Sequence, residues 1–253
     1  MKINFKNHFF LFGGTDLEMV EIKKMLVDGG AIEGEHFADA GLKWGAKLSV
    51  YNDMMHLTKI NVAIELPVDA DAVMPEHFLE IDHHNENSAR PSSIAQVATL
   101  LGIELTHYQK LVAANDTGYI PQLVAVGATQ DEIDFVRAAD RAAQGTTVEQ
   151  EAQCADAIKN GLTKKGALTI VKTQTSKFSP ITDTLFGAQE NLLCVAPDEW
   201  CIYSSAEKVA DLKKKYGEKL TYSGQTFAGV CLQGDGSNKK DFDKMVAEIS
   251  ASF

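Results

Sequence analysis

The sequence predicts an α/β protein: a mostly parallel sheet with flanking helices, followed by a second, smaller α/β domain. Short apolar segments alternate with segments of helical period along roughly the first 160 residues, which is typical of a parallel sheet. Acidic and histidine side chains follow these apolar segments, and the charge balance changes near residue 160. With 253 residues, 45% of them hydrophobic, the chain can form two modest cores.

The first part is expected to contain three strands and several helices. Residues 7–12 form an apolar run typical of a buried strand, and Gly13-Gly14 separates this run from a helix over 16–27. Ser93 is expected to cap a later helix that ends near Leu101, with Gln96 as its capping-box partner. The other predicted elements are strands over 61–66 and 77–81, a helix over 106–115, and interrupted helices over 131–159.

The second part is predicted to be a small α/β unit after a linker. Residues 160–166 are polar and rich in turn-forming residues, so we predict a first domain over 1–160, a linker over 161–166 and a smaller C-terminal domain over 167–253. Its expected strands are 168–173, 192–196, 200–204 and 226–232, and its expected helices are 181–186, 206–216 and 240–250.

Charge and composition argue against several function classes. The net charge is −11, and residues 1–158 carry 11 basic against 24 acidic side chains, so binding of long nucleic acid is disfavoured and metal ions suit the excess carboxylate better. The chain lacks a run of about 20 uncharged apolar residues, which argues against a membrane span. The four cysteines show no C-x-x-C spacing, and we expect a cytoplasmic protein with reduced thiols. An oligomer is compatible with the sequence.

The sharpest local pattern is Asp82-His83-His84, directly after the predicted strand 77–81. Three polar side chains at a strand end belong on a loop, because each would need a polar partner if it were buried. Neutral imidazoles bind metals, and a carboxylate balances their charge. The triplet therefore predicts a metal or phosphate site.

These residues resemble the DHH phosphoesterase family, whose name is this triplet. The resemblance includes the preceding strand, the Ser-capped helix at Pro91-Ser92-Ser93-Ile94, and Asn115-Asp116-Thr117-Gly118 about thirty residues later. It implies a parallel-sheet domain that holds two divalent metals, usually manganese, and a smaller C-terminal domain that closes over a small phosphorylated or nucleotide-type substrate. Mixed carboxylate and imidazole ligands suit manganese, iron or zinc better than calcium.

The resemblance also implies roles for individual residues. Asp16 and Glu18 stand where the family has an Asp-x-Asp whose carboxylates go to different metals. Glu65 stands where the family has a bridging aspartate, and Asp69 is a competing candidate. The predicted metal ligands are Asp16, Glu18, Glu65, His83 and Asp116.

The remaining predicted site residues face the substrate. Asp82 and His84 are the predicted catalytic residues, and His84 would also bind phosphate as a cation. Arg90 and Arg141 are predicted to bind the substrate, because the guanidinium plane matches a phosphate or carboxylate. Arg137 and Arg141 lie one turn apart among carboxylates, which leaves surface salt bridges on a helix as the alternative for both.

One departure from the family pattern keeps two functions open. The family has a metal-binding histidine four residues before its first motif aspartate, where this chain has Phe12, and His8 cannot be assumed to replace it. One or two ions are therefore expected. The predicted function is a metal-dependent phosphoesterase that uses two metals. The alternative is a non-catalytic DHH-like protein that binds one metal or a phosphorylated ligand.

Overall fold

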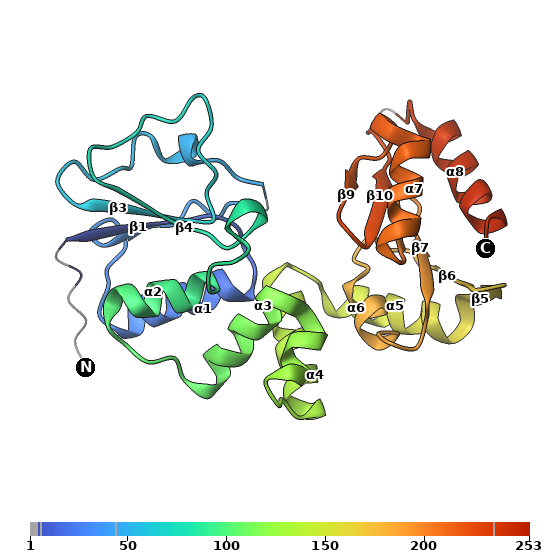
Figure 1. Ribbon diagram of the computed structural model, residues 1–253, viewed down its shortest axis with the longest axis horizontal. Coiled ribbons are helices and arrows are strands. Elements are labelled where there is room, and N and C mark those ends of the chain that lie inside the picture. Colours follow the sequence, from blue (N-terminus) through green and yellow to red (C-terminus); the bar gives the residue numbers. More distant parts are fainter. Residues whose placement is uncertain (1–4, 6, 44, 235) are drawn as a thin grey trace. The chain divides into compact units, whose positions relative to one another are not determined.

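The computed structural model describes residues 5, 7–43, 45–234 and 236–253, and the chain divides into two compact units, residues 1–145 and 146–253. Each unit has its own sheet and its own core (Figure 1). None of the described helices combines the length and the apolar composition that a bilayer crossing needs.

The first unit contains a parallel sheet of four described strands in the order β2-β1-β3-β4. β1 (His8–Phe12) pairs with β2 (Phe37–Ala38) and with β3 (Ile60–Ile64), and β3 pairs with β4 (Phe78–Ile81). Because all four strands run the same way, the segments that follow β1, β3 and β4 meet at one edge of the sheet. The predicted ligand segments of these strands all lie at this edge.

Both faces of this sheet are covered, as expected for a parallel sheet. Phe10 and Phe12 face the side that carries α1 (Leu17–Asp28) and α2 (Ser93–Leu101), whereas Phe9 belongs to the opposite face. The second face is covered by the two connections from β2 to β3 and from β3 to β4. The first of them includes the short helix η1 (Leu48–Tyr51), and both appear in blue and cyan above the strands in Figure 1.

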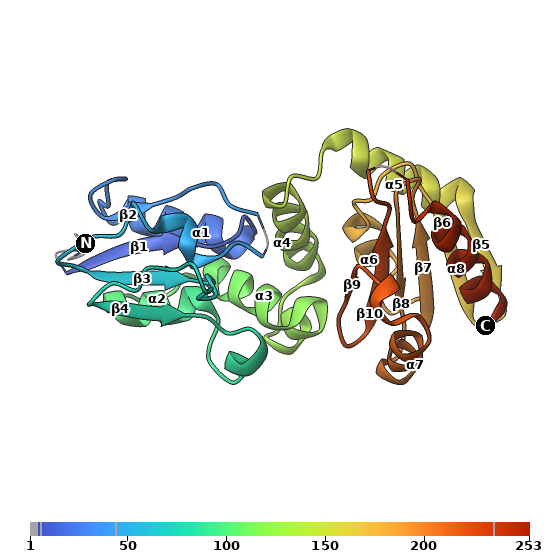
Figure 2. The ribbon, with the colours of Figure 1, turned by 90° about the horizontal axis from the view of Figure 1, so that it is seen from above.

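Two further helices complete the first unit, and α1 packs against both (Figure 2). α3 (His107–Ala125) is kinked, since Gly118 and Tyr119 have non-helical backbone angles. α4 (Gln130–Ala143) begins with a capping box formed by Thr129 and Glu132. A short helix, η2 (Asn85–Asn87), follows the Asp-His-His triplet.

The second unit is built on a six-stranded sheet in the order β5-β6-β7-β8-β10-β9, with helices on both faces (Figure 2). Only the pair β6 and β7 is parallel among its described strands. The strands are β5 (Leu162–Lys165), β6 (Leu168–Lys172), β7 (Asn191–Val195), β8 (Glu199–Tyr203), β9 (Tyr222–Ser223) and β10 (Phe227–Cys231). The helices are α5 (Val148–Gly161), α6 (Ser179–Thr184), α7 (Ala206–Tyr216), η3 (Gly217–Lys219) and α8 (Lys239–Ala251).

The predicted fold class is confirmed, but the predicted linker differs from the structure. Most of 161–166 forms β5, which turns at Gly166 and pairs with β6. The compact units divide between Gly145 and Thr146, one helix earlier. Lys164 and Lys165 thus lie on an exposed edge strand, where lysine is a usual protection against further strand pairing. The polar composition of this segment reflects an edge strand instead of a linker.

Candidate metal centre

The first acidic segment of the site lies where β1 passes into α1. Gly13 is required there, because a Cβ at this position would come 2.5 Å from the carbonyl oxygen of Glu65. Asp16 caps α1, and its Oδ1 accepts a hydrogen bond of 2.9 Å from the backbone N–H of Met19. Glu18 follows in the first turn and is only 1% exposed. Its Oε1 accepts a 3.0 Å hydrogen bond from the Ile94 N–H at the start of α2.

Glu65 is the second acidic residue at this edge and directly follows β3. Its backbone has φ of +52°, a conformation that is uncommon outside glycine and that clusters at functional sites. The Ser93 hydroxyl donates a 2.8 Å hydrogen bond to Glu65 Oε1. Ser92, not Ser93, caps α2 by accepting from the Ala95 N–H, and the Gln96 amide donates to the carbonyl of Pro91. The predicted cap was therefore wrong by one residue, and this shift leaves Ser93 to hold Glu65.

His83 lies at the centre of the cluster and is 6% exposed. Its Nε2 lies 3.4 Å from Glu65 Oε1 and 3.6 Å from Glu18 Oε2, and it forms an ion pair with Asp116 of α3. One imidazole therefore faces three carboxylates that come from three separate segments of the first unit.

Burial and mutual repulsion set the electrostatics of these carboxylates. Burial, assisted by the charges of Asp116 and Glu65, raises the pKa of Glu18 to about 8. Burial likewise raises the pKa of Asp16 to about 7. Burial disfavours the charged form of His83, but its contacts with Asp116, Glu18 and Glu65 outweigh that effect and raise its pKa. In the absence of a metal, the His83 imidazolium is therefore the cation that faces this acidic centre.

The donor atoms fit a divalent ion. Glu18 Oε2, His83 Nε2 and Asp116 Oδ2 are fully buried, and none of them makes a well-aligned hydrogen bond within the described part of the chain. Glu65, His83, His84 and Asp116 each offer a ligand atom, and these four atoms lie within 4.8 Å of one another. Buried polar atoms that point at a common centre are the arrangement expected around a cation, and the mixture of imidazole and carboxylate suits a transition metal.

His84 and Asp82 lie at the exposed side of this cluster. Asp82 Oδ1 accepts a 2.9 Å hydrogen bond from the His84 backbone and lies 3.1 Å from His84 Nδ1. Asp82 therefore orients the His84 ring, whose side chain remains 47% exposed. His84 Nδ1 also lies 4.0 Å from Glu65 Oε1, which places this ring at the edge of the ligand cluster.

The structure brings most of the predicted ligands together. Glu18, Glu65, His83 and Asp116 converge within the distances given above, and Asp16 lies close enough for its pKa to be affected by Glu65 and Asp116. The competing candidate Asp69 is not among the described ligand atoms that converge, and both of its oxygens accept hydrogen bonds from Ser49.

The position that differs from the family pattern turns away from the site. The Phe12 ring packs edge-on against Phe37, with ring centroids 5.8 Å apart, in the core between the sheet and α1. His8 cannot replace the missing imidazole, because it begins β1 whereas Phe12 ends it. At about 3.3 Å per residue, this separation is roughly 13 Å.

The two predicted substrate-binding arginines lie on different segments of the first unit. Arg90 Nη1 lies 3.7 Å from Glu80 Oε2 in an exposed ion pair. Arg141 is half-buried in the last turn of α4. Substrate binding by either arginine stays a prediction.

Sequence reasoning missed a buried ion pair on α4. The local carboxylates of α4 left a surface salt bridge as the alternative role of Arg137, but the side chain is buried and pairs with buried Asp140 at 2.7 Å. A signal was present, because Ile133, Val136, Arg137 and Asp140 occupy the spacing of one buried helix face. An arginine and an aspartate on an otherwise apolar stripe indicate a buried pair.

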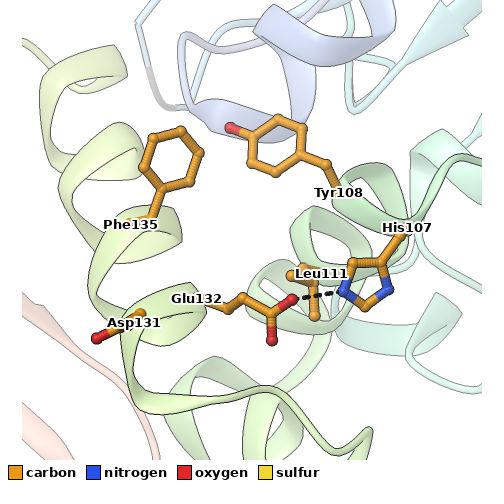
Figure 3. Close-up of a pocket in the computed structure, with 6 residues that line it drawn as sticks. All are labelled: His107, Tyr108, Leu111, Asp131, Glu132 and Phe135. Atoms are coloured by element: carbon orange, nitrogen blue, oxygen red, sulfur yellow. Dashed lines mark hydrogen bonds and ion pairs between the residues drawn. The ribbon is translucent and has the colours of Figure 1, made fainter.

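A separate pocket of about 320 Å³ lies between α3 and α4, away from the cluster (Figure 3). The rings of Tyr108 and Phe135 meet edge to face at one side of it, with centroids 5.7 Å apart, and His107 pairs with Glu132 at 2.7 Å. None of the predicted site residues lines this pocket.

Comparison with known proteins gives only loose likenesses. No protein-family model and no curated protein matches the chain. Among solved structures, a pGpG-specific phosphodiesterase, PggH from Vibrio cholerae, is 10% identical with a TM-score of 0.48, and the match covers 97% of this chain and 100% of that one. RecJ from Thermus thermophilus in complex with Mn²⁺ is 12% identical with a TM-score of 0.48. That match covers all of this chain but only 53% of RecJ.

Proposed function

We propose that this protein is a metal-dependent phosphoesterase that hydrolyses a small phosphorylated or nucleotide-type molecule. One observation carries the proposal: the ligand atoms of Glu65, His83, His84 and Asp116 lie within 4.8 Å of one another at the carboxyl edge of a parallel sheet. The Asp82-His83-His84 motif, by which the sequence resembles the DHH phosphoesterases, supplies two of these four residues. The negative charge of the chain supports a small substrate over a long nucleic acid.

The described residues divide into ion-holding and substrate-facing groups. Glu65, His83 and Asp116, with Glu18 beside them, would hold the ion. A bound divalent ion makes a water molecule more acidic and stabilises negative charge on phosphoryl oxygens. The Nδ1 of His84 lies next to Asp82, which fixes the ring, and as an imidazolium the ring would donate a hydrogen bond from Nε2 to a phosphoryl oxygen.

The alternative function is a non-catalytic protein that binds one ion or a phosphorylated ligand. The observation that favours it is the position of Phe12, whose ring packs into the core where the family has a metal-binding histidine. The loss of one imidazole weakens one of the two metal positions that a two-metal mechanism needs. Metal stoichiometry therefore separates the two functions.

The test combines metal content with hydrolysis. The purified chain is loaded with Mn²⁺ and analysed for metal per chain, and it is assayed with a generic phosphodiester and with pyrophosphate. We expect His83→Ala to lose Mn²⁺, and His84→Ala to retain it but to lose hydrolysis, because only His83 is buried among the carboxylates. His107→Ala, an exposed histidine of the same unit, is the matched control.

Each outcome of this test has one interpretation. Two ions per chain together with hydrolysis would support the phosphoesterase. One ion without turnover would favour the binding protein. Absence of Mn²⁺ from the wild type, or equal loss of Mn²⁺ in both histidine variants, would contradict the assignment of roles given above.

A further inference from the structure

A buried arginine contacts residues that are close in sequence to one of the predicted ligands, Asp116. Arg137 of α4 is 7% exposed, and its Nη1 donates a 2.8 Å hydrogen bond to Asn115 Oδ1 and a 2.7 Å hydrogen bond to Asp140 Oδ2. The Tyr119 ring covers the guanidinium, with 4.4 Å between Arg137 Cζ and the ring centroid. The group is therefore enclosed by hydrogen-bond acceptors and by one aromatic face.

The partners of Arg137 are the immediate neighbours of the predicted ligands. Asn115 precedes Asp116 in α3, and Tyr119 follows it at the kink. Asp140 extends the contact to α1, because its Oδ1 accepts a 3.3 Å hydrogen bond from the backbone N–H of Leu17. Leu17 lies between Asp16 and Glu18.

A single guanidinium thus connects two segments that carry ligands. Through Asn115 it holds the α3 segment of Asp116, and through Asp140 it holds the first turn of α1. These segments are about a hundred residues apart in sequence, and α1 packs against both α3 and α4 (Figure 2). Arginine suits this role because its rigid fork reaches several acceptors at fixed angles, whereas a lysine ammonium acts as a point charge.

We propose that Arg137 is a positioning residue that sets the spacing between Asp116 and the Asp16–Glu18 turn for a divalent ion. This inference rests on the proposed function, because it takes the cluster to be a metal centre. A role through charge alone predicts the opposite change in metal affinity when Arg137 is replaced. A buried positive charge repels a divalent ion, so its removal would tighten metal binding. Removal of a positioning group weakens metal binding.

The experiment measures Mn²⁺ affinity by calorimetry for the wild type and four variants of the full chain. Arg137→Lys keeps the charge and loses the fork, and Arg137→Gln loses both. Asn115→Ala removes one hydrogen bond and leaves the pair of Arg137 and Asp140 in place. Lys24→Met removes a positive charge from an exposed ion pair on α1 and serves as the charge-matched control. Circular dichroism checks that each variant is folded.

We expect Arg137→Lys and Arg137→Gln to weaken Mn²⁺ binding by about 10–100-fold, the usual effect of removing a hydrogen-bond partner behind a metal ligand. Asn115→Ala is expected to weaken binding in the same direction, and it decides the question where an Arg137 variant does not fold. Lys24→Met is expected to bind as the wild type does.

Two results would overturn the inference and leave the proposed function in place. If Arg137→Lys binds Mn²⁺ as the wild type does and Arg137→Gln binds it more tightly, the arginine acts only through its charge. Wild-type affinity in Asn115→Ala would likewise show that the connection to Asp116 is not needed. Failure of the wild type itself to bind Mn²⁺ would overturn the proposed function together with this inference, so the two failures are distinguishable.

Discussion

Replacement of Glu18 by Gln is expected to stabilise the metal-free protein at alkaline pH and to weaken metal binding. Glu18 is buried, and its Oε2 faces His83 at 3.6 Å without a well-aligned hydrogen bond. Glutamine keeps the oxygen that accepts from the Ile94 N–H, and it removes a charge that burial makes unfavourable. The same charge is the one that would attract a cation.

The magnitude follows from the pKa of Glu18, which burial raises from 4.5 to about 8. A carboxyl group with a raised pKa binds its proton more tightly in the folded state, so folding becomes less favourable as the pH rises above 4.5, and the full penalty is reached above about pH 8. The shift corresponds to an upper limit of roughly 5 kcal/mol, at about 1.4 kcal/mol per pKa unit. The raised pKa already includes the attraction between Glu18 and His83. Relaxation of the site and entry of water lower the penalty of the buried charge, and we expect about 2–3 kcal/mol at pH 9.

The assay is urea unfolding in the presence of a chelator. Hydrogen exchange in peptides from α1 is the probe, so that unfolding of the first unit is measured. The difference between Glu18→Gln and the wild type is expected to be near zero at pH 4 and largest at pH 9. Glu104→Gln, an exposed glutamate of the same unit, controls for the loss of a charge. Addition of Mn²⁺ should reverse the order, because an ion that binds only the folded state stabilises the wild type in proportion to its affinity. A Glu18→Gln variant that is less stable than the wild type at pH 9 without metal would refute the reasoning.

Two further predictions concern Phe12 and Glu132. Phe12→His is expected to lose about 1.5–3 kcal/mol of stability, which is the contribution of a buried aromatic side chain, because the Phe12 ring lies in the core against Phe37. For the same reason we expect no gain in Mn²⁺ affinity. Chemical denaturation measures the stability and calorimetry the affinity, and tighter Mn²⁺ binding would contradict the placement of Phe12 in the core. The pKa of Glu132 is lowered to about 2 by its hydrogen bond from the Thr129 backbone and its pair with His107, so its contribution to α4 is present above pH 4.5 and is lost as the pH falls toward 2. Glu132→Gln should remove this pH dependence from amide exchange at the start of α4, and an unchanged profile would show that the capping box does not need the charge.

The strand ends could be predicted from the sequence because two patterns agree there. An apolar run marks each of β1, β3 and β4, and a polar or turn-forming residue ends it. Parallel pairing then places the three ends at one edge, whatever the details of packing. This reasoning was sufficient to place the segments of Glu65 and His83 at one edge, whereas their roles as ligands were implied by the family resemblance. The two-residue strands β2 and β9 carry no such pattern, since two residues are too few to show a period.

The direction of Phe12 could not be predicted, for a physical reason. In a sheet that is covered on one face, alternation of apolar and polar residues tells which way each side chain points. Both faces of this sheet are covered, so β1 is apolar almost throughout and its sequence has no alternation. Only the packing partners decide that Phe10 and Phe12 share the face toward α1.

Two properties of the cluster are unfavourable for folding by themselves: its backbone conformations and its buried negative charge. Glu65, Asn85 and Tyr119 are the non-glycine residues with positive φ in the described part of the chain, and all three lie in segments that carry or adjoin the predicted ligands. Such conformations cost about 1–3 kcal/mol each, and the buried carboxylate of Glu18 adds to this cost at alkaline pH. A folded protein can keep several unfavourable features at one edge when binding of a ligand there stabilises the folded state. Stability measurements on Glu18→Gln and the wild type at pH 9, with and without Mn²⁺, therefore test whether this edge of the sheet binds a cation. If added Mn²⁺ makes the wild type the more stable of the two, cation binding at this edge is supported. If the order of stabilities does not change, cation binding there is contradicted.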